Sequence, residues 1–338
     1  MNRSELLFLY DIVDANPNGD PLDSNKPRID EETEINLVTD VRLKRTIRDY
    51  LHDYKDQGIF IKEIKDENGN IQDAKKRAID FSSPDSDYDN INEAKKDIEN
   101  NILNECIDVR LFGATIPLTI KIKKKNESSS IKLTGPVQFR MGRSLNKVEI
   151  EQIKGTGAFA SGEGKDQKTF REEYILPYSL ISFYGIINEN AAEFTHLSEE
   201  DIELLLDGVW NGTKNLISRS KFGQTPRILL QIEYNENNFF IGDLNNKISI
   251  THNYDDDKKL RKINELEVDL SNLVKNLKEN KDKIKKINYK IDNEVIFKDG
   301  ASIEDILEDF IITEINFWGC FHVWKAISFW YLGGLWVF

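Results

Sequence analysis

The stretch V-T-D-V-R-L-K-R-T-I-R-D-Y-L-H-D-Y, residues 38–54, guides the interpretation of the whole chain. Thr39 or Asp40 is suited to cap a helix, because its side-chain oxygen accepts hydrogen bonds from the first backbone N–H groups. At about 100° per residue, one face of that helix carries the apolar side chains of Leu43, Ile47, Tyr50 and Leu51. The opposite face carries Lys44, Arg45 and Arg48, with Arg42 at its edge.

This basic face belongs to an acidic protein. The chain has 59 Asp and Glu residues against 46 Lys and Arg, a formal net charge of −13, yet no acid lies between Val41 and Arg48. Two interpretations are open. The face binds a polyanion, because Lys and Arg neutralise phosphates and release counterions. Alternatively, it is an ordinary solvated helix face.

Length and composition limit the possible classes of protein. A chain of 338 residues has room for one large or two ordinary domains. The N-terminal M-N-R-S-E-L-L-F-L-Y-D lacks the apolar run of a signal peptide and predicts a first strand over residues 6–13. Two cysteines, Cys106 and Cys320, define neither a disulfide framework nor a metal cluster. We therefore expect a cytoplasmic protein without a membrane partner.

A second basic region follows a polar, acidic segment over residues 55–106, which we interpret as an insertion with a helix near residues 91–104. Between Val109 and Val148 the only acid is Glu127, whereas nine residues are basic: Arg110, Lys121, Lys123, Lys124, Lys125, Lys132, Arg140, Arg143 and Lys147. Residues 121–130 predict a basic loop. Residues 131–141 predict a strand that lies at an edge or is bulged, because it contains Gly135-Pro136.

Residues 147–177 predict a long hairpin with the glycine-rich tip G-T-G-A-F-A-S-G-E-G-K. Gly155 to Ala160 imitates the G-x-G-x-x-A dinucleotide fingerprint, but that motif needs a helix at its glycines. Gly162 and Gly164 would break such a helix, so we expect no cofactor. Phe159 is placed to wedge between stacked nucleic-acid bases, and Lys165 and Lys168 to reach phosphates or an acidic neighbour.

The C-terminal half predicts alternating strands and helices. Residues 178–187 are apolar enough for a buried central strand. Ser198 caps a helix whose buried face has Ile202, Leu205, Leu206 and Val209. An acid-free segment then carries Lys214, Arg219, Lys221 and Arg227, and residues 228–234 form a strand.

Residues 260–292 allow two structures. Their leucines and isoleucines fit a coiled-coil heptad, but Leu266, Val268 and Leu270 also alternate at period two. We predict strand, helix over about residues 272–287, then strand, with a short final helix over residues 302–310. Residues 317–338 hold four of the five tryptophans and only one charged residue, Lys325. A membrane span, an unusual packed tail and a terminus read out of frame all remain open for them.

No group of residues predicts catalysis. Asp11, Asp14, Asp20 and Asp23 cluster around the turn sequence N-P-N-G-D-P, but their spacing matches no calcium loop. The histidines, His52, His196, His252 and His322, lie outside the basic motifs. We therefore expect no metal and no catalytic residues.

Several motifs resemble a known family in the same order along the chain. They are N-P-N-G-D-P, V-T-D-V-R-L-K-R-T-I-R-D-Y-L, D-V-R-L-F-G, T-G-P-V-Q-F, F-R-E-E-Y-I-L-P-Y, F-Y-G-I-I-N-E and W-N-G-T-K-N-L-I-S-R-S-K. Over roughly residues 4–310 the chain resembles the Cas-seven family, most closely the backbone subunit of the type I-B CRISPR Cascade complex. The Trp-rich tail departs from the family pattern.

The resemblance implies an α+β fold: a modified RNA-recognition-motif, or ferredoxin-like, palm with large insertions and a long thumb hairpin. The palm would comprise residues 1–54, 107–146 and 178–310, the inserted acidic subdomain residues 55–106, the thumb residues 147–177, and the atypical tail residues 311–338.

The resemblance also implies a non-catalytic protein that polymerises along the spacer of a CRISPR RNA. The bases of this RNA would stay free to pair with target DNA. The partners of the protein would be the CRISPR RNA, further copies of itself and other Cascade subunits. The main rival is a ribonuclease of the RAMP superfamily, in which Asp20 or Asp23 would support metal-dependent cleavage. The expected RNA-binding residues are Arg42, Lys44, Arg45, Arg48, Arg140, Arg143, Phe159, Lys165, Lys168, Lys214, Arg219 and Lys221.

Overall fold

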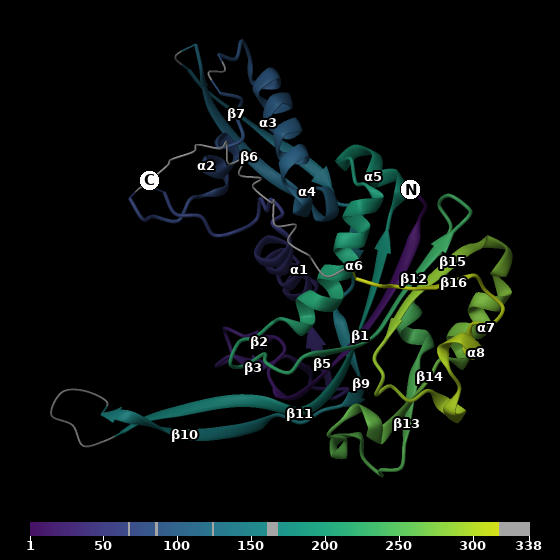
Figure 1. Ribbon diagram of the computed structural model, residues 1–338. Coiled ribbons are helices and arrows are strands. Elements are labelled where there is room, and N and C mark those ends of the chain that lie inside the picture. Colours follow the sequence, from purple (N-terminus) through teal and green to yellow (C-terminus); the bar gives the residue numbers. More distant parts are fainter. Residues whose placement is uncertain (67, 85–86, 124, 161–167, 318–338) are drawn as a thin grey trace, which may run out of the picture.

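The computed structural model describes residues 1–317, apart from 67, 85–86, 124 and 161–167 (Figure 1). Its centre is a mixed sheet of ten strands. Eight of them follow the order β16-β15-β12-β1-β11-β9-β5-β4, and the other two, β8 and β10, pair with β11. The central strand β1 (Ser4–Ala15) pairs antiparallel with β11 (Lys168–Ile187) on one side and with β12 (Thr225–Tyr234) on the other. The first strand, the buried central strand and the strand expected at 228–234 are therefore confirmed.

The two faces of the sheet are covered by different helices (Figure 1). Successive side chains of a strand point to opposite faces, so Phe8 and Tyr10 of β1 join one hydrophobic cluster whereas Leu7 and Leu9 join another. The first cluster lies against α1 (Asp40–Lys55) and α6 (Glu199–Lys214). The second lies against α7 (Ser271–Glu279) and α8 (Ile303–Ile306). Both layers are needed to bury a sheet that is apolar on both sides.

Helices α1 and α6 pack tightly on each other, and both begin at caps that the sequence predicts. Thr39 caps α1 by accepting a hydrogen bond from the backbone N–H of Arg42. Ser198 and Asp201 form a capping box at the start of α6. A Cβ atom added to Gly208 of α6 would lie 2.9 Å from Cγ2 of Ile47. The close approach of the two helices therefore depends on this glycine.

The inserted segment forms a unit with its own hydrophobic cluster, which includes Phe60, Ile98, Ile116 and Ile131. Its elements are α2 (Ala74–Ile79), α3 (Ile91–Glu105), α4 (Ile107–Phe112), β6 (Gly113–Ile122) and β7 (Lys125–Thr134). The helix predicted near residues 91–104 is thereby confirmed.

The structure differs from the prediction in the secondary structure of residues 121–130 and in the extent of the inserted unit. Residues 121–130 are not a loop: β6 and β7 pair along their whole length, from Gly113 opposite Thr134 to Ile122 opposite Lys125. The reason is that Ile116, Leu118 and Ile131 are fully or almost fully buried on the inserted helices. Residues 113–134, which we expected in the palm, therefore pack with the inserted unit.

The long hairpin predicted over residues 147–177 is present. Strand β10 (Glu151–Ala160) pairs antiparallel with the first half of β11 and extends away from the sheet (Figure 1). The 20-residue β11 continues from this hairpin into the middle of the sheet. The hairpin is therefore joined rigidly to the core through one strand.

Small elements complete the N-terminal half and the middle of the chain. They are β2 (Gly19–Asp20), β3 (Lys26–Pro27), β4 (Ile29–Asp30), β5 (Ile35–Val38), β8 (Val137–Phe139), β9 (Gly142–Lys147) and α5 (Glu189–Thr195).

Residues 260–292 adopt the predicted strand, helix, strand order, but the helix is shorter than expected. Strand β13 (Ser249–His252) pairs with β14 (Leu266–Asp269), and α7 ends at Glu279. Strand β15 (Ile284–Ile291) then pairs with β12. Alternation of Ile287 and Tyr289 onto the buried face overrides helix propensity there.

The C-terminal elements are also short. Helix α8 is shorter than predicted and is followed by β16 (Ile312–Glu314), which runs parallel to β15. The Trp-rich stretch after Phe317 lies outside the described residues. Among the helices of the described part, none is both long and apolar enough to cross a membrane.

Candidate nucleic-acid interface

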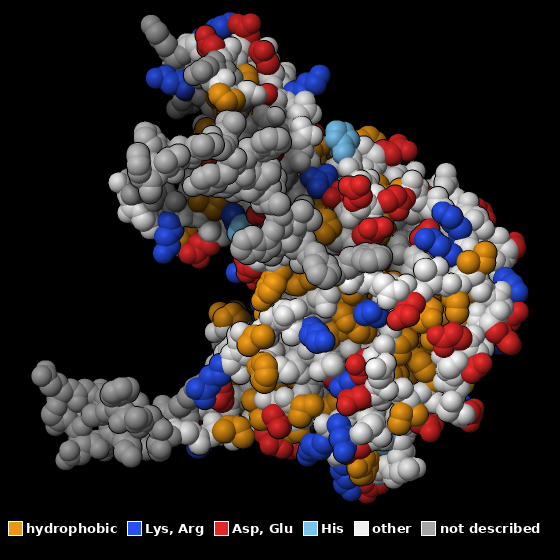
Figure 2. Space-filling model, in the orientation of Figure 1, with side chains coloured by type: hydrophobic (Ala, Val, Ile, Leu, Met, Phe, Trp, Pro, Cys, Tyr) orange, Lys and Arg blue, Asp and Glu red, His pale blue; other side chains and the backbone are white. Residues whose placement is uncertain are grey.

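The molecule is hollowed between the inserted unit and the long hairpin (Figure 2). Helix α1 and the short strands β2 and β3 lie along this hollow in Figure 1. The loop after α6 reaches the same region, because the backbone N–H of Asn16 donates a hydrogen bond to the carbonyl of Ser220. This loop brings the acid-free segment around Lys221 next to the N-P-N-G turn and the start of α1.

Arg42 and Lys221 form the most distinctive part of this surface. The Arg42 Nη2 group donates to Thr46 Oγ1 at 2.9 Å, while its buried Nε has no hydrogen-bond partner among the described residues. The Lys221 Nζ group donates to the carbonyl of Asn16 at 3.2 Å. Within the described chain, neither cation forms an ion pair with a carboxylate.

Electrostatics shows that these two cations are close and incompletely compensated. Burial lowers the pKa of the Lys221 ammonium below its usual value, and the positive charge of Arg42 lowers it further. The pKa of the Arg42 guanidinium is also lowered, chiefly by burial. An anion placed here would relieve the mutual repulsion, so the pair is chemically suited to a phosphate.

Buried amides with unused hydrogen-bonding atoms lie on the two segments that meet here. They are Asn16, Asn18 and Gln224, whose Oδ1, Nδ2 and Nε2 atoms, respectively, lack partners in the described residues. Buried polar atoms are nearly always paired in folded proteins, through water or ligands where protein groups are absent. Sequence analysis missed these amides, although the N-P-N-G turn that contains two of them was noted.

Lys44 and Arg48, which the sequence predicts among the RNA-binding residues, do not lie on an open helix face. Lys44 is only 9% exposed, and its Nζ contacts Asp40 Oδ2 at 3.1 Å and Gln138 Oε1 at 3.2 Å. The Arg48 Nε lies 2.9 Å from Oδ2 of the fully buried Asp108. The inserted unit packs onto this side of α1, which turns these cations into structural groups.

The other predicted cations for which side chains are described lie on the surface, and most are paired. Arg45 pairs with Asp49 at 2.7 Å, and Arg143 with Asp30 at 3.3 Å. Arg140 pairs with Asp243, and Arg219 with Glu173 at 3.2 Å. Lys214 is exposed at the end of α6 and has no ion pair within the described part of the chain. The structure thus brings Arg42 and Lys221 together and leaves the others dispersed.

Three predicted residues belong to the far end of the hairpin. The backbone of Phe159 lies in β10 and that of Lys168 begins β11, but their side chains and all of Lys165 lie outside the described residues.

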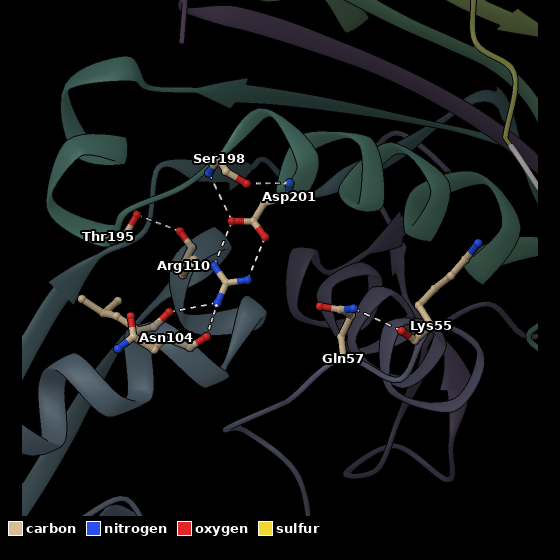
Figure 3. A network of polar contacts seen from close by, with 8 residues as sticks. Lys55, Gln57, Asn104, Arg110, Thr195, Ser198 and Asp201 are labelled. Atoms are coloured by element: carbon tan, nitrogen blue, oxygen red, sulfur yellow. Dashed lines mark hydrogen bonds and ion pairs between the residues drawn. The ribbon is translucent and has the colours of Figure 1, made fainter. Parts of the chain in front are cut away.

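The conspicuous cation of the D-V-R-L-F-G motif has a structural role (Figure 3). Arg110 of α4 donates two hydrogen bonds of 2.8 Å to the carboxylate of Asp201, and a third to the carbonyl of Leu103. Its own carbonyl accepts from Thr195 Oγ1. Arg110 therefore joins the inserted unit to the start of α6, and Asp108 and Arg110 together fix the insertion on α1 and α6.

Two acids of the N-P-N-G-D-P region form ion pairs with neighbouring cations. Asp20 pairs with Arg28 at 2.9 Å and Asp23 with Lys26 at 2.8 Å. No group of three or more metal-ligating side chains occurs among the residues that the structure describes. His52 contacts Lys62, and His196 ends α5 in a left-handed conformation. These positions are typical of turn and surface residues.

Comparisons with known proteins agree with the architecture. The family profile for "CRISPR-associated protein Cas7" matches residues 2–271. The chain is 36% identical over 296 residues to the CRISPR-associated protein Cas7 of Haloferax volcanii, covering 84% of this chain and 85% of that protein. A chain from a solved "CRISPR RNA-guided surveillance complex, pre-nicking" has the same fold, with a TM-score of 0.52, 13% identity, and 92% and 96% of the two chains covered. The family resemblance drawn from the motifs is thereby confirmed: this chain belongs to the CRISPR-associated Cas7 family.

Proposed function

We propose that this protein is a non-catalytic backbone subunit that binds CRISPR RNA in a Cascade-type complex, of subtype I-B. The observation that carries the proposal is the pair Arg42 and Lys221, two partly buried cations without a carboxylate partner in the described chain. Phosphate groups would compensate both charges, and such contacts carry no sequence information. This property suits a protein that must accept any guide sequence.

The order of elements supports a modified RNA-recognition-motif palm. Strands β1, β9, β11 and β12 with helices α1 and α6 follow the β-α-β-β-α-β pattern, and both helices lie on one face. In an ordinary RNA-recognition motif the other face stacks bases. Here α7, α8 and their neighbours cover that face. We infer that RNA contacts have moved to the edge where α1, the N-P-N-G turn and the loop after α6 meet.

The long hairpin suits the role of an assembly arm, or thumb. It projects from the sheet on the continuous strand β11, which extends it away from the core toward the position of a neighbour (Figure 1). In this proposal copies line up along the spacer, other Cascade subunits close the ends, and bases between contacts pair with target DNA.

A binding titration with RNA of about 30 nucleotides tests the central claim. The double variant Arg42→Glu with Lys221→Glu is expected to lose RNA affinity by more than about 100-fold at moderate salt, equally for unrelated sequences. The matched control, Lys262→Glu with Lys275→Glu, makes the same charge change at exposed sites and is expected to change affinity little. Equal losses in both variants would show that only net charge matters and would refute the site.

Incubation of the protein with labelled RNA and Mg²⁺ or Mn²⁺ separates this proposal from the ribonuclease alternative. We expect protection of the RNA without cleavage. Time-dependent cleavage that is abolished by Asp20→Ala or Asp23→Ala would establish the nuclease instead.

A further inference from the structure

A groove of about 470 Å³ lies on the palm between the first turns of α6 and the sheet edge formed by β15 and β16. Its walls carry six carboxylates: Glu199, Glu200, Glu203, Asp207, Glu233 and Glu314. Figure 2 shows several acidic side chains close together on the viewed face, to the right of the atoms drawn in grey. The floor is partly apolar, with Ile202 and Leu206 from α6 and Ile315 and Phe317 after β16.

Half of these carboxylates are compensated within the protein. Asp207 pairs with Lys55 at 2.5 Å, and Glu233 pairs with Lys286 at 2.9 Å. Glu199 lies 3.6 Å from the N-terminal ammonium group. In the described chain, the other three carboxylates, Glu200, Glu203 and Glu314, form no ion pair. Glu203 and Glu314 are exposed and lie on opposite walls of the groove. The groove thus retains an uncompensated negative charge above an apolar floor.

The hairpin β6–β7 has the complementary properties. Its two strands end at Ile122 and Lys125, and near this end the side chains of Lys121 and Lys125 are exposed and form no ion pair with any described residue. Among the lysines described at this end of the hairpin, Lys123 alone is paired, with Asp89 at 2.9 Å on the surface. The tip lies at the outer end of the inserted unit, whereas the groove lies on the palm (Figure 1).

We propose that the acidic groove receives the basic tip of the β6–β7 hairpin from a second copy of this chain. The inference rests on the proposed function, and it names the two surfaces that meet when copies line up on RNA. Opposite charges on the two surfaces favour and orient the contact. Because the groove and the tip are different surfaces of one molecule, the contact is head-to-tail and leaves one groove and one tip free for further copies.

Charge reversal of each surface tests the contact on long RNA. The groove variant is Glu203→Lys with Glu314→Lys, and the tip variant is Lys121→Glu with Lys125→Glu. Each is expected to raise the protein concentration needed for regular multi-copy assemblies, seen by electron microscopy, at least tenfold. An equimolar mixture of both variants is expected to assemble as the wild type does. When the two variants alternate, the acidic tip of the tip variant meets the basic groove of the groove variant. The unchanged basic tip of the groove variant meets the unchanged acidic groove of the tip variant.

A second titration uses RNA too short for two copies, with folding checked by circular dichroism. Both variants are expected to keep wild-type affinity for this RNA, because neither surface belongs to the Arg42 and Lys221 site. If the tip variant loses short-RNA affinity and the mixture fails to assemble, the tip binds nucleic acid and the inference is overturned. If folded variants assemble normally alone, the groove is no interface. Failure of wild-type protein to bind any RNA would instead reject the proposed function.

Discussion

The start and the middle of helix α1 carry the same kinds of cation in different environments. At the start, Arg42 lies beside Lys221 and has no carboxylate partner among the described residues. Lys44 and Arg48, on a different side of the helix, are buried or nearly buried against Asp40, Gln138 and Asp108. The binding charge that we propose on this helix is therefore the cation to which the fold brings no carboxylate, whereas Lys44 and Arg48 are held by groups of the protein itself.

Asp108→Ala is expected to have the largest effect. This fully buried carboxylate accepts hydrogen bonds from Arg48 Nε and from the backbone N–H groups of Phe60 and Ile61, at 2.8–3.1 Å. Its removal leaves a nearly buried guanidinium without a partner, which typically costs about 3–5 kcal/mol. Urea unfolding followed by circular dichroism measures the loss.

The control is Asp49→Ala, which removes the partner of Arg45 on the same helix. Both side chains are largely exposed, 64% and 43%, and exposed pairs contribute at most about 1 kcal/mol. Similar losses for Asp108→Ala and Asp49→Ala would contradict the division of α1 into structural and binding cations.

The sequence predicts local structure well because local signals are strong. Thr39 and Ser198 cap the two helices, and apolar alternation or continuity defines β1, the second half of β11, and β12. Residues 121–130 of the hairpin β6–β7 resemble a loop in sequence because lysines and serines dominate them, although Ile116, Leu118, Ile120 and Ile122 alternate as in a strand. That alternation was a usable signal.

The division of the cations could not be predicted in the same way. Arg48 and Asp108 are 60 residues apart, and Arg110 and Asp201 are 91 apart. The distance in sequence between such partners does not predict their contact, because the fold brings them together. A longer or shorter insertion between them would leave the contact unchanged. The same holds for Arg42 and Lys221, which meet only because the loop after α6 bonds to Asn16.

Single substitutions within α1 sharpen the comparison at the level of binding. Arg42→Ala is expected to lower RNA affinity about tenfold and to reduce the slope of log affinity against log salt by about one, because one phosphate contact is lost. Arg45→Ala is expected to change affinity less than about twofold, since Asp49 already neutralises that guanidinium. The salt series is measured by fluorescence anisotropy. A greater loss for Arg45→Ala would reverse the assignment.

The smallest expected effect concerns protons. Burial and the nearby Arg42 charge lower the pKa of Lys221 in the free protein, whereas a bound phosphate would raise it by favouring the charged form. Binding at alkaline pH should therefore take up a fraction of a proton, and affinity should fall as pH rises through the lowered pKa.

Calorimetry at about pH 9 in buffers of different ionisation enthalpy measures this uptake. Lys221→Arg should retain affinity and take up less, because arginine keeps its proton throughout this range. Equal proton uptake by the wild type and Lys221→Arg would show that the phosphate does not sit at Lys221, even if Arg42 still contributes to affinity.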